Sequence, residues 1–205
     1  MYTLDLIHSD VDGPVPTKSI NGCRYFLTFI DDCSRYRWIY FMKLKSDFFE
    51  TFKSFKAIVE NRFNKNIKSI ISDGGGEYVK IYVQNFCESE GIRMEHSVPY
   101  TPQQNGVVER KNRPLKKMAT FLLHAKHLPP YLWAEAVKCA SYLHNRVPHK
   151  SVVGVTPFEA LHGYKPNVSH MRVFGSKSWA RIPLDKRKAF QAQSRESVHS
   201  AGICR

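Results

Sequence analysis

The chain has 205 residues, of which 42% are hydrophobic and 13% aromatic, a composition that excludes a disordered or fibrous protein. No apolar run approaches the roughly 20 residues that a transmembrane helix needs, so we expect no membrane partner. The net charge of +13 is uneven, because residues 1–100 carry 13 basic and 13 acidic side chains whereas residues 101–205 carry 18 and 5. This asymmetry favours a polyanionic partner, of which nucleic acid is the commonest.

The N-terminus and the cysteines indicate the compartment. The first residues contain neither a basic leader nor a long apolar segment with a cleavage site, which predicts an intracellular protein. The five cysteines are an odd number and include no Cys-x-x-Cys pair. This argues against both a disulfide framework and a thiolate zinc site.

The first half of the chain predicts an α/β sheet. Residues 4–8 form a short apolar strand that a turn at Gly13-Pro14 closes, and residues 25–30 and 38–42 form an antiparallel pair. An amphipathic helix over residues 46–64 is followed by a strand, a second helix and a further strand, over residues 67–71, 80–90 and 92–98. Strands alternating with helices in this order predict a sheet with helices packed on it.

The second half is predicted to be mainly helical. A polar, turn-rich loop over residues 99–106 precedes a helix from about residue 107, and another helix follows Pro129-Pro130. The pattern weakens beyond about residue 165. We therefore predict a catalytic-core domain with its following helices over residues 1–168 and a partly disordered C-terminal extension over residues 169–205.

Three acids lie on three different predicted elements. Asp10 follows the first strand, Asp73 follows the strand over residues 67–71, and Glu109 lies in the first turns of the helix 36 positions further on. Ligand-binding groups in open α/β sheets gather at strand ends. Carboxylates from separate elements can hold a pair of hard cations, Mg²⁺ or Mn²⁺, for phosphoryl transfer. We expect this triad to be both the metal site and the catalytic site.

Several other residues compete for these roles. Asp12 shares a strand face with Asp10 if the strand continues that far, but Gly13-Pro14 favours a turn position for it. Asp31 and Asp32 are expected to be turn residues, and Glu77 lies too close to Asp73 to come from a distinct element. His124 and His127 have no cysteine partners, so we interpret them as surface histidines.

The helix that carries Glu109 is basic on one side and apolar on the other. The apolar side is predicted to pack on the core and the basic side to contact phosphates. We predict nucleic-acid contacts from the preceding loop and from this helix, namely Gln103, Gln104, Asn105, Arg110, Asn112, Arg113, Lys116 and Lys117.

Several long phrases, in order, resemble the integrase catalytic core of copia-type LTR retrotransposons, a retroviral-type DDE family. The phrases are residues 7–14, 24–32, 99–113, 132–137 and 172–175, within a similarity from about Leu4 to Arg181. The resemblance implies an RNase H-like mixed sheet flanked by helices, with a helical C-terminal extension. It also implies that Asp10, Asp73 and Glu109 form the family's triad with Mg²⁺ or Mn²⁺.

The implied reactions are trimming of the 3′ ends of element DNA and their joining to target DNA, by a homo-oligomer. The resemblance also implies that, in an active element, the protein occurs in the nucleus and in cytoplasmic virus-like particles. The family's zinc-binding and reverse transcriptase modules are expected upstream and downstream, which makes this chain a fragment of a polyprotein.

Two positions depart from the family's usual pattern. Gly74 stands directly after Asp73, where the family usually has Asn, and Pro114 stands where it usually has Thr or Ser. A proline deep in a helix costs roughly 3 kcal/mol or more, because it removes a hydrogen bond and clashes with the preceding turn. These departures keep open a catalytically inactive, nucleic-acid-binding remnant of a retrotransposon polyprotein. A stand-alone RNase H-like nuclease is a third interpretation.

Overall fold

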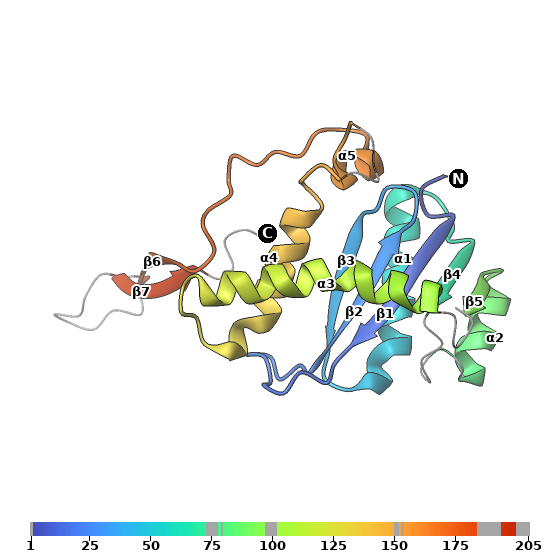
Figure 1. The fold of residues 1–205 in the computed structure, drawn as a ribbon, viewed down its shortest axis with the longest axis horizontal. Helices are drawn as coiled ribbons and strands as arrows, with labels where there is room; N and C mark the ends of the chain where they lie inside the picture. Colours follow the sequence, from blue (N-terminus) through green and yellow to red (C-terminus); the bar gives the residue numbers. More distant parts are fainter. Residues whose placement is uncertain are drawn as a thin grey trace.

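The fold is known from a computed structural model, which describes residues 2–72, 78, 80–96, 102–149, 152, 154–183 and 194–199. At its centre is a mixed five-stranded sheet with the order β3-β2-β1-β4-β5 (Figure 1). The strands are β1 (Leu6–Asp12), β2 (Tyr25–Asp31), β3 (Arg37–Met42), β4 (Ser69–Ser72) and β5 (Arg93–His96). β1, β2 and β3 pair antiparallel, whereas β4 pairs parallel with both β1 and β5.

Helices cover both faces of this sheet. The helical elements are η1 (Lys45–Asp47), α1 (Phe48–Phe63), α2 (Ile81–Ser89), α3 (Pro102–His124), η2 (Pro130–Leu132), α4 (Trp133–His144) and α5 (Pro157–His162). Figure 1 shows α3 crossing the sheet on one side, with α1 on the other. This arrangement confirms the predicted α/β class.

Strand alternation sends successive side chains of β2 into two separate cores. Leu27 and Phe29 join the core formed with α1 and α2, where Phe29 stacks on Phe55 with ring centroids 3.9 Å apart. Phe26 joins the core formed with α3 and α4, where it packs against Trp133. Each face of the sheet is therefore covered, and a polar side chain on either face needs a partner.

The edge strand β3 is closed by a side chain that follows α4. The Asn145 side chain, which directly follows α4, accepts a hydrogen bond from the Arg37 backbone N–H at 2.9 Å and donates one to the Arg37 carbonyl at 2.8 Å. An exposed strand edge leaves such groups unpaired, so this amide completes the ladder at the start of β3. It also fixes the end of α4 against the sheet.

Two sequence predictions for these elements were wrong, and one helix was not predicted. β1 continues to Asp12, which pairs with Phe26, so Asp12 is a strand residue rather than a turn residue. α3 begins at Pro102, inside the segment predicted to be a loop, since proline is favoured at the first helical position. α5 was not predicted, although Thr156 caps it by accepting a hydrogen bond from the Glu159 N–H and Pro157 opens it.

The last described strands, β6 (Ser176–Arg181) and β7 (Ser194–His199), form a two-stranded antiparallel sheet. They lie within residues 169–205, and the proposed division of the chain at residue 168 stays a prediction. Four cysteines in the described residues, Cys23, Cys33, Cys87 and Cys139, are not joined in disulfides. Among the helices that the structure describes, none is long and apolar enough to cross a membrane.

Candidate active site on the α3 face of the sheet

Asp10 lies within β1 on the face that α3 covers. It is paired with Thr28, and its neighbour Ser9 points to the opposite face, where its hydroxyl lies 2.6 Å from the Tyr78 hydroxyl. Asp10 is half-buried, and its carboxylate accepts a hydrogen bond from the side-chain amide of Asn112 on α3, at 2.5 Å. This contact joins residues 102 positions apart and places α3 against the carboxylate.

Asn112 also contacts the buried guanidinium of Arg37. The distance from Arg37 Nη1 to Asn112 Oδ1 is 3.4 Å, and only 2% of Asn112 and 4% of Arg37 is exposed. Desolvation lowers the pKa of Arg37 to about 10, and the charge of Asp10 opposes that shift. Arg37 therefore stays cationic at neutral pH, and Asp10, Asn112 and Arg37 form a buried polar network between β1, α3 and β3.

A second contact repeats the first one turn further along α3. The Lys116 ammonium forms an ion pair with the Asp12 carboxylate. Two residues of a strand advance about 6.7 Å and four residues of a helix advance about 6 Å, so Asp10 and Asp12 match Asn112 and Lys116 in spacing. α3 therefore presents both side chains to β1 where it crosses the sheet, and the Asp12 carboxylate is already ion-paired with Lys116.

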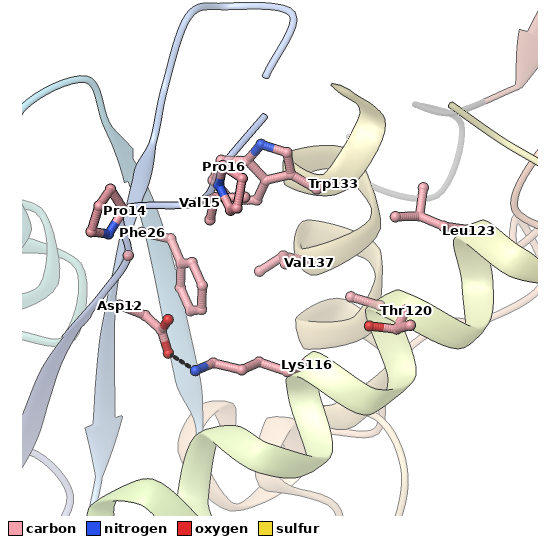
Figure 2. A pocket seen from close by; sticks show the side chains of 12 residues that line it. Asp12, Pro14, Val15, Pro16, Phe26, Lys116, Thr120, Leu123, Trp133 and Val137 are labelled. Atoms are coloured by element: carbon pink, nitrogen blue, oxygen red, sulfur yellow. Dashed lines mark ion pairs between the residues drawn. The ribbon is translucent and has the colours of Figure 1, made fainter. Parts of the chain in front are cut away.

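Figure 2 shows the cavity beside this ion pair, of about 470 Å³. Phe26, Trp133 and Val137 form its apolar wall, and Lys116 reaches across its edge to Asp12. Asp10 and Asp12 lie on the same face of β1, and the apolar cavity begins next to Asp12.

The other two members of the predicted triad cannot be located in the same way. Asp73 lies outside the described residues, and the side chain of Glu109 is also outside them, although its backbone is part of α3. Ser72 directly precedes Asp73 in sequence and is paired with Ser9, the residue before Asp10. Glu109 precedes Asn112 by three residues, which is close to one helical turn.

Tyr78 is a buried residue next to this site that the sequence analysis missed. Its side chain is fully buried, packs edge-on against Phe48 with ring centroids 4.4 Å apart, and reaches Ser9. Residues 73–77 are thus bounded by Ser72 and Tyr78, which both contact Ser9. An aromatic residue shortly after an acidic, glycine-rich segment was the only sequence signal.

The competing acids have structural partners. Asp31 is fully buried and accepts hydrogen bonds from the Leu4 N–H, the Ser34 N–H and the Ser34 hydroxyl. Asp32 pairs with Arg35 and lies 2.7 Å from His8 Nε2. Asp32 lies in the turn, as predicted, whereas Asp31 is the last residue of β2 and pairs with Ile7, so its prediction as a turn residue was wrong. His124 and His127 are exposed, and no group of three or more His, Cys, Asp or Glu suited to a metal occurs in the described part of the chain.

The predicted nucleic-acid contacts divide into three groups. Arg113, Lys116 and Lys117 are exposed on α3, as expected for a basic face. Asn112 is buried against Asp10 and so differs from its prediction as a phosphate contact, because a helix position beside basic residues can still face the sheet. The side chains of Gln103, Gln104, Asn105 and Arg110 lie outside the described residues.

Burial suppresses the protonation of a histidine next to this network. His144, at the end of α4, has a pKa lowered to about 3 by desolvation and then by the charges of Arg37 and His149. It is therefore neutral at physiological pH and does not add to the positive charge around Arg37.

Comparison with known proteins adds three findings. Residues 4–102 match the integrase core domain family. The chain is 40% identical over 191 residues to the retrovirus-related Pol polyprotein from transposon TNT 1-94 of Nicotiana tabacum, covering 93% of this chain and 14% of that protein. It is 38% identical over 187 residues to the corresponding polyprotein from transposon RE2 of Arabidopsis thaliana, covering 90% of this chain and 13% of that protein.

The chain therefore spans about a seventh of the length of these relatives. A similar solved structure is a chain from the simian T-cell lymphotropic virus intasome in complex with PP2A regulatory subunit B56 gamma. The TM-score is 0.61 at 19% identity, and the alignment covers 96% of this chain and 68% of that one. This similarity confirms the predicted RNase H-like fold.

Proposed function

We propose that the α3 face of this chain is the active site of a divalent-metal-dependent polynucleotidyl transferase. The chain contains an integrase core domain and is similar over most of its length to retrovirus-related Pol polyproteins of plant transposons. Proteins with this domain act in DNA integration. The proposed substrate is the retrotransposon's own DNA, whose 3′ ends the protein would process and join to target DNA.

The observation that carries this proposal is the hydrogen bond from Asn112 to Asp10. It fixes α3, the helix of Glu109, against the strand of Asp10. Ser72, which directly precedes Asp73, lies on β4 and is paired with Ser9, the residue before Asp10 on β1. Three carboxylates from β1, the end of β4 and α3 would then share one site.

These residues suit a hard cation. Asp10, Asp73 and Glu109 offer only carboxylate oxygens, the ligands that Mg²⁺ and Mn²⁺ prefer. Such ions would stabilise the negative charge that develops on the attacked phosphate. In the joining step the 3′ oxygen of element DNA forms a new bond to a target phosphorus, and the target's own bond from phosphorus to its 3′ oxygen breaks.

The protein's own residues would position the DNA and the acids. Arg113 and Lys117 are exposed on the same helix as Glu109, so they can contact the backbone phosphates of a bound duplex. Asn112 and Arg37 would hold Asp10 in one orientation. A homo-oligomer, in which two copies act on the two DNA ends, is part of the same proposal.

Plasmid nicking and oligonucleotide joining test the proposal. With Mg²⁺ or Mn²⁺ the chain should nick supercoiled plasmid and join a labelled element end to it, and Asp10→Asn or Asp73→Asn should abolish both reactions. The half-buried Asp12, already paired with Lys116, provides a matched control, and Asp12→Asn should retain activity. Nicking that survives Asp73→Asn would refute this site.

A catalytically inactive nucleic-acid-binding remnant is the second candidate. Pro114 lies inside α3, five residues after Glu109, and Gly74 directly follows Asp73. If the remnant is correct, the chain binds DNA but neither nicks nor joins it with either metal. Restoration of activity by Gly74→Asn and Pro114→Thr would attribute the loss to these two positions.

A further inference from the structure

A second pocket lies at the β3 edge of the sheet. Its volume is about 360 Å³, and it is formed by the start of β3, the end of α1, α4 and α5. In Figure 1 the C-terminal part of α4 leads toward α5 beside β3. The proposed function uses none of the side chains that line this pocket except Arg37.

The lining of this pocket is basic. Arg62 and Lys138 are exposed and Arg146 is half-buried, and the described residues that line the pocket include no carboxylate. None of these three side chains forms an ion pair with another residue that the structure describes. Arg37 contributes less, because its guanidinium is directed at Asn112.

The acids on the same elements do not cancel this charge. Glu60, two residues before Arg62, pairs with Lys56 and accepts a hydrogen bond from the Ile67 N–H. Glu135 on α4 and Glu159 on α5 do not line the pocket. The three cations therefore share a concave surface to which no described residue contributes an anion.

Arg146 is held in one orientation by aromatic rings. The central carbon of its guanidinium lies 3.4 Å from the Tyr142 ring centroid and 4.7 Å from that of Phe158. It donates one hydrogen bond to the Tyr142 carbonyl at 3.2 Å, whereas its buried Nε has no hydrogen-bond partner among the described residues. A stacked guanidinium loses little further side-chain entropy when it binds an anion.

The aromatic rings also belong to the pocket. Tyr36 and Tyr142 are half-buried parts of its wall, and Phe158 packs beside them. Burial raises the pKa of Tyr36, while the charges of Arg146 and Arg62 oppose the rise. Both arginines are therefore close enough to influence one ring, which supports their convergence on the same space.

We propose that this pocket binds single-stranded nucleic acid, with a backbone phosphate held by Arg62, Lys138 and Arg146 and a neighbouring base against the tyrosine rings. Cationic grooves with aromatic platforms bind single strands because every base has a stacking face. A rigid duplex presents its phosphates on a convex surface and keeps its bases paired, so it cannot place a base in a pocket of this size. The proposal does not depend on the proposed active site.

Fluorescence anisotropy with labelled oligonucleotides of about 12 nucleotides tests this proposal. The measurements use Asp10→Asn protein in EDTA, so that metal-dependent cleavage of the oligonucleotide cannot influence the result. Replacing Arg62 and Lys138 together by Gln should lower the slope of log K against log salt for a single strand by up to about 0.7, since the loss of one phosphate contact removes about 0.7 from that slope. Affinity for a duplex of the same length should change less.

Lys43 and Lys53 provide a matched control. Lys43 is exposed and lies just after β3, and Lys53 is half-buried, pairs with Glu50 and lies in the first half of α1. They are at the other ends of the elements that carry Arg37 and Arg62. The Lys43→Gln, Lys53→Gln variant loses the same charge but should keep the single-strand affinity. Equal losses in the two double variants, or equal losses for duplex and single strand, would overturn the proposal.

Arg146→Lys separates stacking from charge. Lysine keeps the charge but cannot form the planar stack on Tyr142, so single-strand affinity should fall several-fold while circular dichroism confirms the fold. Unchanged affinity would contradict the proposed role of Arg146. Displacement of the oligonucleotide by inorganic phosphate as effectively as by an equal concentration of unlabelled strand would show a free-phosphate site and would also overturn the proposal.

Discussion

Replacing Asn112 by Ala should destabilise the fold by about 2–4 kcal/mol. The hydrogen bond from Asn112 to the Asp10 carboxylate involves a charged acceptor and is worth roughly 1.5–3 kcal/mol. The longer contact from Arg37 at 3.4 Å adds less, but its loss deprives a buried guanidinium of an acceptor. For a urea slope of roughly 2 kcal/mol per M, the unfolding midpoint should fall by about 1–2 M.

Urea unfolding followed by circular dichroism measures this change. Thr120→Ala, at an exposed position on the same helix, is the control and should shift stability by less than about 0.5 kcal/mol. A double-mutant cycle with Asp10→Asn isolates the pair and should give a coupling of about 1 kcal/mol or more. Additive effects of the two substitutions would show that Asn112 does not hold Asp10, and would remove the main support for the proposed site.

Three further outcomes are expected. Tyr78→Phe should cost about 1–3 kcal/mol in urea unfolding because it leaves the buried Ser9 hydroxyl without this partner; no loss would show that this contact does not anchor residue 78. The folded-state pKa of His144 is about 3, below its ordinary 6.5, so folding favours the neutral form of this side chain. The stability that neutral His144 contributes is therefore present above pH 6.5 and is lost as pH falls toward 3. His144→Gln should therefore flatten the fall of unfolding free energy across this window by up to about 1.4 kcal/mol per pH unit, whereas His124→Gln on the surface should not. Gly13→Ala should lower the melting temperature, because Gly13 has φ +129° and a Cβ there would lie 2.6 Å from the Arg24 carbonyl; an unchanged melting temperature would contradict this backbone constraint.

Much of the sheet could be predicted from local patterns. The runs that became β2, β3 and α1 are long and strongly apolar, and their periods of two and of three to four residues distinguish strand from helix. The start of α3 was mispredicted because Gln103, Gln104 and Asn105 have the composition of a loop, while Pro102 is a favourable first residue of a helix. Turn composition and helix initiation use overlapping residue types, so sequence alone does not separate them.

The sequence by itself determined the strand–helix order, the basic charge of the second half and the acids that could serve a metal, because these depend on residue type and spacing along the chain. Only the tertiary structure decided which side chains meet. Asn112 and Lys117 are both polar residues of α3, yet one is buried against Asp10 and the other is exposed. The pocket of Arg62, Lys138 and Arg146 likewise combines two helices and the segment after one of them. Such contacts depend on how the helices are oriented on the sheet, and that orientation is set by packing between residues that are distant in sequence.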